Sequence, residues 1–507
     1  MSRKLALIPV DARPVTYDLP KDLAQLADWE LITPPKAALG FLKKAADFSA
    51  LFQWMKDTAA MVEGFVVSID MILYGGLVPS RINSDSETII KERLERFLKI
   101  KQEYPHIQIM AFSSTMRLSN SYVNQEEKDY WKEYGKEIWS YSYHHHLFQK
   151  YGLSEDMAIV TDLKNKIPDS ILNDYLVSRD RNFVINLSLI DYVEQGVIDI
   201  LIFPQDDTSE YGLNIMEQEQ LKEKVFEKNL YERIYIYPGA DEVASVLTAR
   251  IIYQLEEEEL PTFYPIYSGM KGALSIAMYE DRPLLESVKG QVYAFGSHTV
   301  EHPEEAHIIL GVNVPGRKQG DLAIQVNLNE VDTNDRNLGE WVRKLHYYYK
   351  NDKRVAIADV AYANGADPAM IPQLLSIFSI QQLSGFAAWN TAGNTIGTAV
   401  AQAALVYLAD KQGRSTNQVK DKQFLVRLLD DYLYQTIVRQ EVRKIVNEEE
   451  GQREVLLEKV KELFHHQSIQ LINKTNMRYH IDSIYLPWDR TFEIGIQLKS
   501  NEQEGFS

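Results

Sequence analysis

The sequence predicts an α/β fold in which parallel strands alternate with helices. Short apolar runs rich in Val, Ile and aromatic residues recur along the chain, and longer amphipathic segments separate them. This alternation is typical of parallel α/β architecture. Nearly every run ends in polar or glycine-rich residues. Several strands sharing one functional rim indicate a (β/α)8 barrel, because an open doubly wound sheet concentrates its ligand groups at one switch point.

We expect a (β/α)8-barrel-like amino-terminal domain over residues 1–260, because six of the apolar runs precede residue 240. Residues 261–410 are expected to be a second, flavodoxin-like α/β region that contributes to the cleft. That region either completes the barrel or forms a separate layer. The apolar runs are Leu5–Val10, Leu31–Thr33, Gly64–Ile69, Ile107–Phe112, Ile198–Phe203, Ile234–Tyr237, Phe263–Tyr267, Val292–Phe295, Ile308–Val312, Val355–Ala358 and Gly385–Ala388.

Residues 411–507 are expected to form a helical appendage with a closing strand. Residues 417–474 are dense in Glu, Lys, Arg and Leu, and a loop over 485–490 and a strand over 492–496 follow. Phe424, Leu428, Tyr432 and Leu433 recur at three- and four-residue spacings, which predicts one buried helix face. This face packs either on the α/β body, which we favour, or on a second copy of the chain in a homodimer.

Composition narrows the classes of function. The net charge of −18 disfavours nucleic acid and anionic membranes as partners. With no cysteine, the chain lacks disulfides, thiolate metal sites and a cysteine nucleophile. The sequence has no apolar stretch of the ~20 residues that span a bilayer, and its first apolar run is too short for a signal peptide, so we expect a cytoplasmic protein. Neither a dinucleotide fingerprint nor a P-loop motif is present, which disfavours both cofactor classes.

The adjacent carboxylates Asp206 and Asp207 are the most informative feature of the chain. They follow an apolar run that ends at Pro204, so we expect them at the carboxyl end of a buried strand. Two neighbouring carboxylates can be held at different pKa values, one as an acid and one ionised. Alternatively, Asp207 caps the next helix and Asp206 faces water.

Other polar side chains follow other strands and are candidates for substrate binding. An arginine held beside a carboxylate suits bidentate recognition, and a Gly-Gly pair lets the backbone approach a ligand closely. A tryptophan supplies an apolar wall for a sugar ring, and asparagine amides both donate and accept hydrogen bonds. The alternative roles are ion pairs, helix caps and core packing. The candidates are Asp11, Arg13, Asp70, Tyr74 (before Gly75-Gly76), Arg117, Asp241, Asp359, Trp389, Asn390 and Asn394.

The run His144-His145-His146 is not expected to bind metal. Successive helical residues point about 100° apart, so the three imidazoles cannot share one face. The flanking aromatic residues Trp139, Tyr141, Tyr143 and Phe148 instead indicate an aromatic surface or lid.

Six segments together resemble a known family. They are Pro9–Pro14, Ser68–Arg81, Gln205–Gly212, Pro238–Arg250, Asp359–Asp367 and Gly385–Gly397. They are similar to a bacterial family of unknown function, number 4127 in the domain-of-unknown-function series. The resemblance covers residues 1 to about 400 and is weaker in the helical tail. In that family an acid often stands where this chain has Ala12. The family implies no activity, cofactor or catalytic residues.

The leading hypothesis is a glycoside hydrolase acting on a small or imported glycoside, without a metal or other cofactor. Asp207 is the expected general acid and Asp206 the stabilising carboxylate. The arrangement is similar to that of β-N-acetylhexosaminidases that use the acetamido group of the substrate, so an N-acetylhexosaminide is one expected substrate. One alternative is a metal-dependent hydrolase of phosphate or amide substrates, with an oxygen-rich site for Mg²⁺ or Mn²⁺. The other is a non-catalytic sugar-binding protein.

Overall fold

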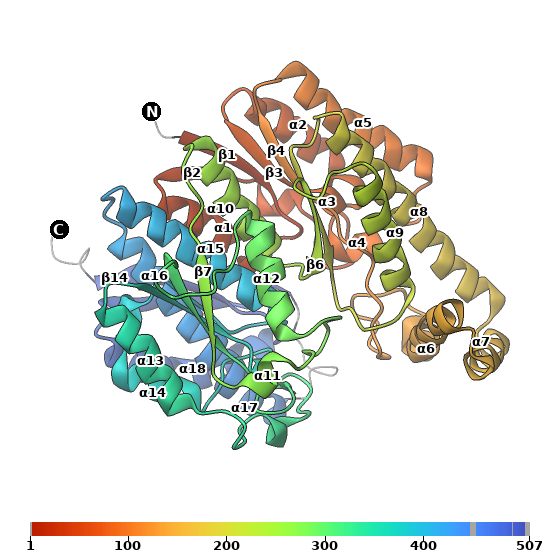
Figure 1. Ribbon diagram of the computed structural model, residues 1–507. Coiled ribbons are helices and arrows are strands. Elements are labelled where there is room, and N and C mark those ends of the chain that lie inside the picture. Colours follow the sequence, from red (N-terminus) through yellow and green to blue (C-terminus); the bar gives the residue numbers. More distant parts are fainter. Residues whose placement is uncertain (1–2, 447–452, 489, 502–507) are drawn as a thin grey trace. The chain divides into compact units, whose positions relative to one another are not determined.

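The computed structural model describes residues 3–446, 453–488 and 490–501 and has a mixed α/β fold with parallel sheets (Figure 1). The chain forms two compact units. Unit 1 comprises residues 1–12, 31–247 and 279–281, and unit 2 comprises residues 13–30, 248–278 and 282–507. Among the described residues, no helix is both long enough and apolar enough to cross a membrane.

The sheet of unit 1 has six strands in the order β2-β1-β3-β4-β5-β6. The pairs β1–β3, β3–β4, β4–β5 and β5–β6 are all parallel. Every residue of β3 and β5 is buried, which explains why these strands are continuous apolar runs. The strands are β1 (Arg3–Ile8), β2 (Trp29–Ile32), β3 (Gly64–Ser68), β4 (Gln108–Phe112), β5 (Ile200–Gln205) and β6 (Ile234–Pro238).

The expected (β/α)8 barrel is not confirmed. The strand order corresponds to a flavodoxin-like open sheet extended by β6, and β7 (Phe263–Tyr267) belongs to a different sheet. From β1 the chain steps to β2 on one side and then to β3 on the other side of β1. This reversal distinguishes an open sheet from a barrel. It leaves no trace in the local sequence, because both folds place polar residues after the strands.

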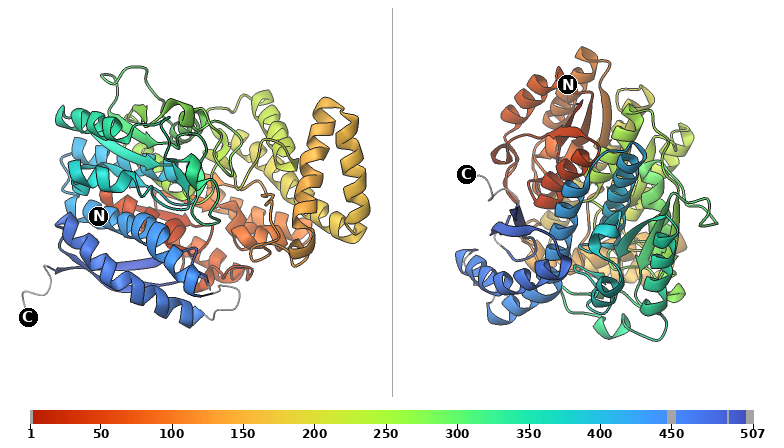
Figure 2. Two further views of the ribbon diagram at one scale, coloured as in Figure 1. Left: turned by 90° about the horizontal axis from the view of Figure 1, so that it is seen from below. Right: turned by 90° about the vertical axis from the view of Figure 1, so that its left-hand side faces the viewer.

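The helices of unit 1 follow the strands along the chain. Helices α6 and α7 lie side by side (Figure 2). With part of α8 they enclose a separate cluster of buried residues that includes Trp131, Ile138, Leu163 and Tyr175. The helices are α2 (Phe48–Ala59), α3 (Ile69–Tyr74), α4 (Leu77–Ile82), α5 (Glu87–Glu103), α6 (Trp131–Tyr151), α7 (Ser154–Lys166), α8 (Asp169–Glu194) and α9 (Leu213–Glu227), with the short turn η1 (Lys36–Ala38). Helix α10 (Val243–Leu255) begins in unit 1 and ends in unit 2.

Unit 2 contains a four-stranded sheet in the order β12-β10-β8-β7, with all its pairs parallel. Its remaining strands are β8 (Ile308–Asn313), β10 (Arg354–Asp359) and β12 (Gly385–Ala387). A Cβ on Gly311 would meet side chains of α13 (Leu338–Lys350), whereas one on Gly385 would meet the backbone of α15 (Ala392–Lys411). Gly311 pairs with Ile357 and Gly385 with its neighbour Ala356. Because neighbouring residues of a strand face opposite ways, α13 and α15 cover opposite faces of the sheet.

Other helices and two small sheets complete the first part of unit 2. Helix α1 (Pro14–Leu26) packs against α15. The predicted strand at Val292–Phe295 is wrong, because these residues form the last turn of α12 (Leu284–Phe295), which ends at Gly296 in the left-handed conformation. The other elements are α11 (Met270–Ala273), α14 (Met370–Ile377), η2 (Leu328–Glu330), η3 (Ile380–Gln382) and the parallel pair β9 (Gly320–Asp321) and β11 (Tyr362–Ala363).

The carboxyl-terminal tail is also part of unit 2. Its elements are α16 (Asn417–Arg427), the π-helix η4 (Leu428–Val438), α17 (Arg439–Ile445) and α18 (Arg453–Thr475), followed by the antiparallel strands β13 (Tyr479–Tyr485) and β14 (Gly495–Ser500). The predicted buried face is confirmed, because Phe424, Leu428 and Leu433 share a core with Ile357 and Phe386 of the sheet. Residues 447–452 of the predicted helical stretch and residue 489 of the predicted loop lie outside the described residues.

Candidate functional site

The aspartate pair lies where the sequence predicts, directly after strand β5, which ends at Gln205. The Gln205 amide donates to Oγ1 of Thr115 at 2.8 Å, and the Thr115 N–H donates to the Pro204 carbonyl at 3.0 Å. These bonds tie the segment after β4 to the end of β5. Asp207 has a φ of +40°, in the left-handed region. Such a conformation is uncommon for a residue other than glycine and occurs at turns and functional sites.

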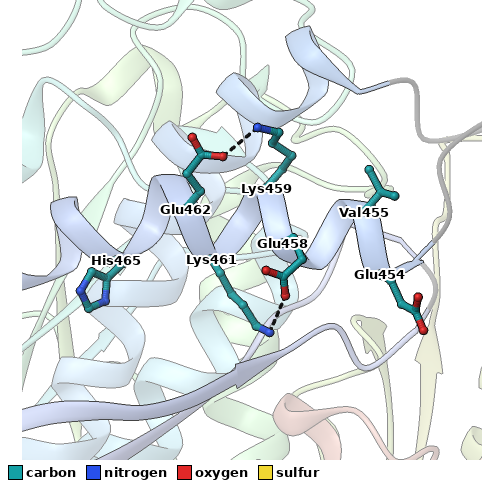
Figure 3. Close-up of a pocket in the computed structure, with 7 residues that line it drawn as sticks. All are labelled: Glu454, Val455, Glu458, Lys459, Lys461, Glu462 and His465. Carbon is teal, nitrogen blue, oxygen red and sulfur yellow. Dashed lines mark hydrogen bonds and ion pairs between the residues drawn. The ribbon is translucent and has the colours of Figure 1, made fainter.

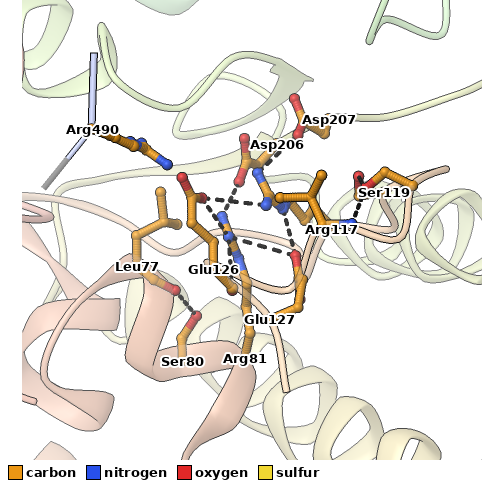
Figure 4. A network of polar contacts seen from close by, with 12 residues as sticks. Leu77, Ser80, Arg81, Arg117, Ser119, Glu126, Glu127, Asp206, Asp207 and Arg490 are labelled. Atoms are coloured by element: carbon orange, nitrogen blue, oxygen red, sulfur yellow. Dashed lines mark hydrogen bonds and ion pairs between the residues drawn. The ribbon is translucent and has the colours of Figure 1, made fainter. Parts of the chain in front are cut away.

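Two arginines hold the two aspartates separately (Figure 4). An Nη2 proton of Arg81 is donated to Oδ2 of Asp206 at 2.6 Å, and Nη1 of Arg117 donates to Oδ2 of Asp207 at 2.9 Å. The Arg81 side chain is only 2% exposed, whereas those of Asp206 and Asp207 are 14% and 23% exposed. The carboxylates therefore reach solvent while the guanidinium of Arg81 is fixed below them.

Glu126 and Glu127 bind the same two arginines from a neighbouring loop. Glu126 lies 3.0 Å from Arg81 and 3.3 Å from Arg117, and Glu127 lies 2.7 Å from Arg117 and 3.7 Å from Arg81. Four carboxylates thus share two guanidinium groups. We call these six residues the arginine–carboxylate network.

Asp207 is the acid in the network that is placed to retain a proton. Burial raises the pKa of Asp207 to about 7, against the opposing charge of Arg117 and with a further contribution from Asp206. Burial opposes ionisation of Arg117, yet Glu126, Glu127 and Asp207 together raise its pKa above the ordinary value. A partly exposed carboxyl group that is half protonated near neutral pH can act as a general acid and then as a general base.

Asp70 and Tyr74 follow strand β3 on the short helix α3, and both are buried. Oδ2 of Asp70 accepts the backbone N–H of Ser114 at 2.9 Å, and burial raises the pKa of Asp70 to about 6. The Tyr74 hydroxyl makes no hydrogen bond in the described structure, and burial raises its pKa. The guanidinium of Arg181 lies 5.4 Å from the Tyr74 ring centre. Asp70 therefore links the loops after β3 and β4, and Tyr74 offers an unused polar group.

Asp11 follows strand β1 and Asp241 follows strand β6, at the same edge of the sheet, and both side chains are buried. The neighbouring Glu242 accepts the backbone N–H of Ala240 at 2.9 Å. Unit 1 thus brings together seven of the predicted residues at the carboxyl ends of its strands: Asp11, Asp70, Tyr74, Arg117, Asp206, Asp207 and Asp241.

The other five predicted residues belong to unit 2, and Asp359 is the most enclosed of them. It ends β10, where its Oδ1 accepts Nδ2 of Asn313 at 2.8 Å and its Oδ2 accepts the N–H of Asp367 at 2.7 Å. Burial and then Asp367 raise the pKa of Asp359. Arg336, also buried, donates to Asp367 at 2.6 Å. These contacts form a closed polar cluster at the carboxyl end of the second sheet.

Trp389, Asn390 and Asn394 lie at the end of β12 and the start of α15, and Trp389 and Asn394 are buried. The Trp389 ring contacts Phe492 with centroids 5.5 Å apart, and its indole N–H makes no hydrogen bond in the described structure. Asn390 has a φ of +72°, and its carbonyl accepts the N–H of Asn364 at 3.0 Å. Trp389 thus packs as a core residue while keeping one polar atom unused.

Arg13 precedes α1 and lies against the end of the chain. Its guanidinium is 4.8 Å from the Trp488 ring centre and 3.6 Å from a carboxylate oxygen of Glu493. This carboxylate comes from the far end of the sequence, whereas the sequence suggested a carboxylate near Arg13. Within unit 2, Arg13 therefore packs against residues near the carboxyl terminus.

Sequence reasoning missed several charged residues that the structure brings to these edges. Arg81, Glu126 and Glu127 complete the network in unit 1, and no local pattern singles them out. In unit 2, η4 carries a second pair of adjacent acids, Asp430 and Asp431, bound by Arg427 at 2.8 and 3.0 Å. The adjacent acids could have marked this pair in the sequence, but they lie in a stretch that resembles a charged surface helix.

A surface depression along α18 offers no comparable chemistry (Figure 3). Its charged residues pair within the helix, Lys459 with Glu462 at 2.7 Å and Lys461 with Glu458 at 2.8 Å. Such pairs are typical of a solvated helix face. The described part of the chain also contains no group of three or more His, Asp or Glu side chains arranged to hold a metal ion.

The chain matches the model of one protein family, and the match covers residues 5–497. No curated protein and no solved structure matches it. The matched segment holds both units almost completely and all of the predicted site residues. The chain therefore belongs to the family described as Protein of unknown function (DUF4127).

Proposed function

We propose that this protein is a glycoside hydrolase in which Asp207 is the general acid. The observation that carries the proposal is the placement of two adjacent, partly exposed carboxyl groups at the end of β5, each held by its own arginine. The pKa of Asp207, which burial raises to about 7, supports its role as the acid. A glycosidase needs a carboxyl group that is still protonated near neutral pH beside a second carboxylate. Asp206 supplies that second group, and Arg81 holds it at 2.6 Å.

In the proposed reaction, Asp207 donates its proton to the glycosidic oxygen as the bond from that oxygen to the anomeric carbon breaks. The Asp206 carboxylate stabilises the positive charge that develops on the sugar ring. Water then adds to the anomeric carbon, and its proton returns to Asp207. Arg117 positions the acid through its 2.9 Å contact. The proposed substrate is a small or imported glycoside, with N-acetylhexosaminides among those to test first.

The test compares leaving groups. The purified protein is assayed on a panel of nitrophenyl glycosides and on methyl glycosides of the sugar that is turned over. Asp207→Asn should lose roughly 10²–10⁴-fold in kcat on the methyl glycoside, the range for general acid catalysis. It should lose much less on the nitrophenyl glycoside, whose leaving group needs little protonation. Asp206→Asn should be impaired on both substrates.

The matched control is Asp162→Asn, which changes an exposed carboxylate paired with Lys166 on α7. It should keep full activity on both substrates. Absence of turnover on every sugar, or unchanged rates in both Asp206→Asn and Asp207→Asn, would show the proposal to be wrong.

A non-catalytic sugar-binding protein is the second candidate, favoured by the ion pairing of all four carboxylates in the network. Carboxylates held in this way can accept hydrogen bonds from sugar hydroxyls without donating a proton. A rise in melting temperature with a sugar that the protein does not hydrolyse would favour this candidate. Sensitivity to EDTA would instead favour a metal-dependent hydrolase.

A further inference from the structure

The loop that carries the two aspartates is held at its far end by helix α6. This loop runs from Asp206 to Gly212, directly before α9. Gly212 occupies the position before α9, where a side chain usually caps the helix, and it has none to offer. Two side chains of α6 instead accept N–H groups at this junction. The N–H of Gly212 donates to Nδ1 of His146 at 3.1 Å, and the N–H of Leu213 donates to Oγ of Ser142 at 2.7 Å.

Ser142 and His146 are one helical turn apart, so they present both acceptors on one face of α6. The space around Gly212 is closed: a Cβ there would lie 2.6 Å from Oδ1 of Asn214 and 3.2 Å from Oγ of Ser142, and its φ is +150°. Asn214, in the first turn of α9, donates to Oγ1 of Thr208 in the loop at 2.8 Å. The loop is thus fixed at its end by His146 and across its middle by Asn214.

The hydrogen bond from Gly212 requires a neutral imidazole. Nδ1 must present a lone pair to accept an N–H, and a protonated ring would turn N–H toward N–H. The His146 side chain is 2% exposed. Burial lowers the pKa of His146, with Lys150 acting in the same direction and Glu219 opposing it. Nε2 of His146 lies 3.5 Å from a carboxylate oxygen of Glu219 on α9.

The other titratable groups around this ring come from α6, the loop and α9. The Tyr211 ring packs against His146 with centroids 5.5 Å apart, and Tyr143 contacts Tyr211 at the same distance. The groups that face His146 directly or through Tyr211 include Tyr143, His145, Lys150, Tyr151, Glu210, Tyr211 and Glu219. The carboxylate of Glu219 is half exposed, so it compensates little for a buried imidazolium.

We infer that His146 is a positioning residue whose neutral form fixes the loop carrying Asp206 and Asp207, and whose protonation releases that loop. The link to catalysis rests on the proposed function, but the link between His146 and the loop does not. Acidification would therefore loosen residues 206–213 before it unfolds the sheet, and a glycosidase built this way would lose activity on the acid side through displacement of its acid–base pair.

Hydrogen exchange followed by mass spectrometry tests the structural part. Protection of a peptide covering residues 206–216 is measured at about pH 7.5 and about pH 5, on either side of the ordinary histidine pKa, and corrected for intrinsic exchange rates. In the wild-type protein, protection should fall by roughly tenfold or more at the lower pH, as a local opening would cause. A peptide covering β6, Ile234–Pro238, should remain protected at both pH values.

Two variants distinguish the effect of protonating His146 from the effect of losing its hydrogen-bond acceptor. His146→Asn places an amide oxygen near the position of Nδ1 without a titratable group, so its protection should not fall at the lower pH. His146→Leu removes the acceptor and should have low protection at both pH values. Equal protection of the wild-type peptide at both pH values, or the same acid-induced loss in His146→Asn, would overturn the inference.

Activity gives an independent readout. On any glycoside that is turned over, wild-type kcat should fall more steeply below about pH 6 than that of His146→Asn, because only the wild-type loop is released by a proton. KM should change less than kcat in this comparison. If no glycoside is hydrolysed, the proposed function fails while the exchange result still decides the role of His146.

Discussion

Replacing Asp207 by Asn should change how stability depends on pH. In the folded protein the pKa of Asp207 is raised from 3.8 to about 7, so between these values the native state binds a proton that the unfolded chain has released. The free energy of unfolding therefore falls as the pH rises through this window. The contribution of Asp207 is complete below about pH 4 and is lost above about pH 7.

The magnitude follows from the shift. Each pKa unit corresponds to about 1.4 kcal/mol, so a shift of about three units sets an upper bound near 4 kcal/mol. The side chain is 23% exposed and paired with Arg117. Because solvent screens part of the interaction, we expect about 2 kcal/mol. Asn cannot ionise, and about two thirds of the shift lies above pH 5, so relative to the wild type the variant should gain about 1 kcal/mol of stability between pH 5 and pH 8.

The assay is urea unfolding of both proteins at several pH values, followed by tryptophan fluorescence and circular dichroism. Since the chain has two compact units, unfolding can occur in two transitions. The comparison uses the transition whose midpoint differs between the variant and the wild type. Asp162→Asn is the control, because that carboxylate is 64% exposed and should leave the pH profile unchanged. A difference between Asp207→Asn and wild type that stays within about 0.5 kcal/mol from pH 5 to pH 8 would refute the reasoning.

Three further substitutions test packing and charge, each by thermal unfolding. Arg81→Ala should cost about 3 kcal/mol, because it leaves two mostly buried carboxylates without their cation, and Arg81→Lys should recover part of this loss; equal melting temperatures would contradict it. Gly385→Ala should cost about 1–3 kcal/mol, since its Cβ would lie 2.8 Å from a carbonyl oxygen of α15, whereas Gly339→Ala, with no neighbour within 3.5 Å, should be neutral or stabilising. Asp431→Ala should cost about 3 kcal/mol by removing the acceptor of the Ala388 N–H, and a variant as stable as the wild type would show that this contact is dispensable.

The sequence predicts the strands better than their order. Runs such as Gly64–Ile69 and Ile198–Phe203 become β3 and β5 because a strand buried on both faces is apolar throughout. The position of β2 beside β1 depends on how the chain crosses the sheet, and no short segment encodes that crossing. The run Val292–Phe295 resembles a strand for a similar reason, since a short apolar run does not by itself distinguish a buried strand from the last turn of a helix.

The candidate site was predictable to the same degree. Asp206 and Asp207 were found because local sequence places them after a strand. Their partners were not, because Arg81 lies 125 residues from Asp206 and Arg117 lies 90 residues from Asp207. The contacts between these arginines and the two aspartates are visible only in the folded structure. The pKa of about 7 for Asp207 likewise follows from burial, which a sequence does not display.

The packing of α1 has a consequence for how the protein is made. Helix α1 buries Val15, Leu19 and Leu23, and the helix it packs against, α15, begins at Ala392. During translation the apolar face of α1 leaves the ribosome long before α15 exists to cover it. The apolar face of α1 therefore stays exposed to solvent during most of the synthesis of the chain, when aggregation competes with folding. Chaperone capture of the emerging amino terminus, and low yields of carboxyl-terminally shortened chains, follow from this delay.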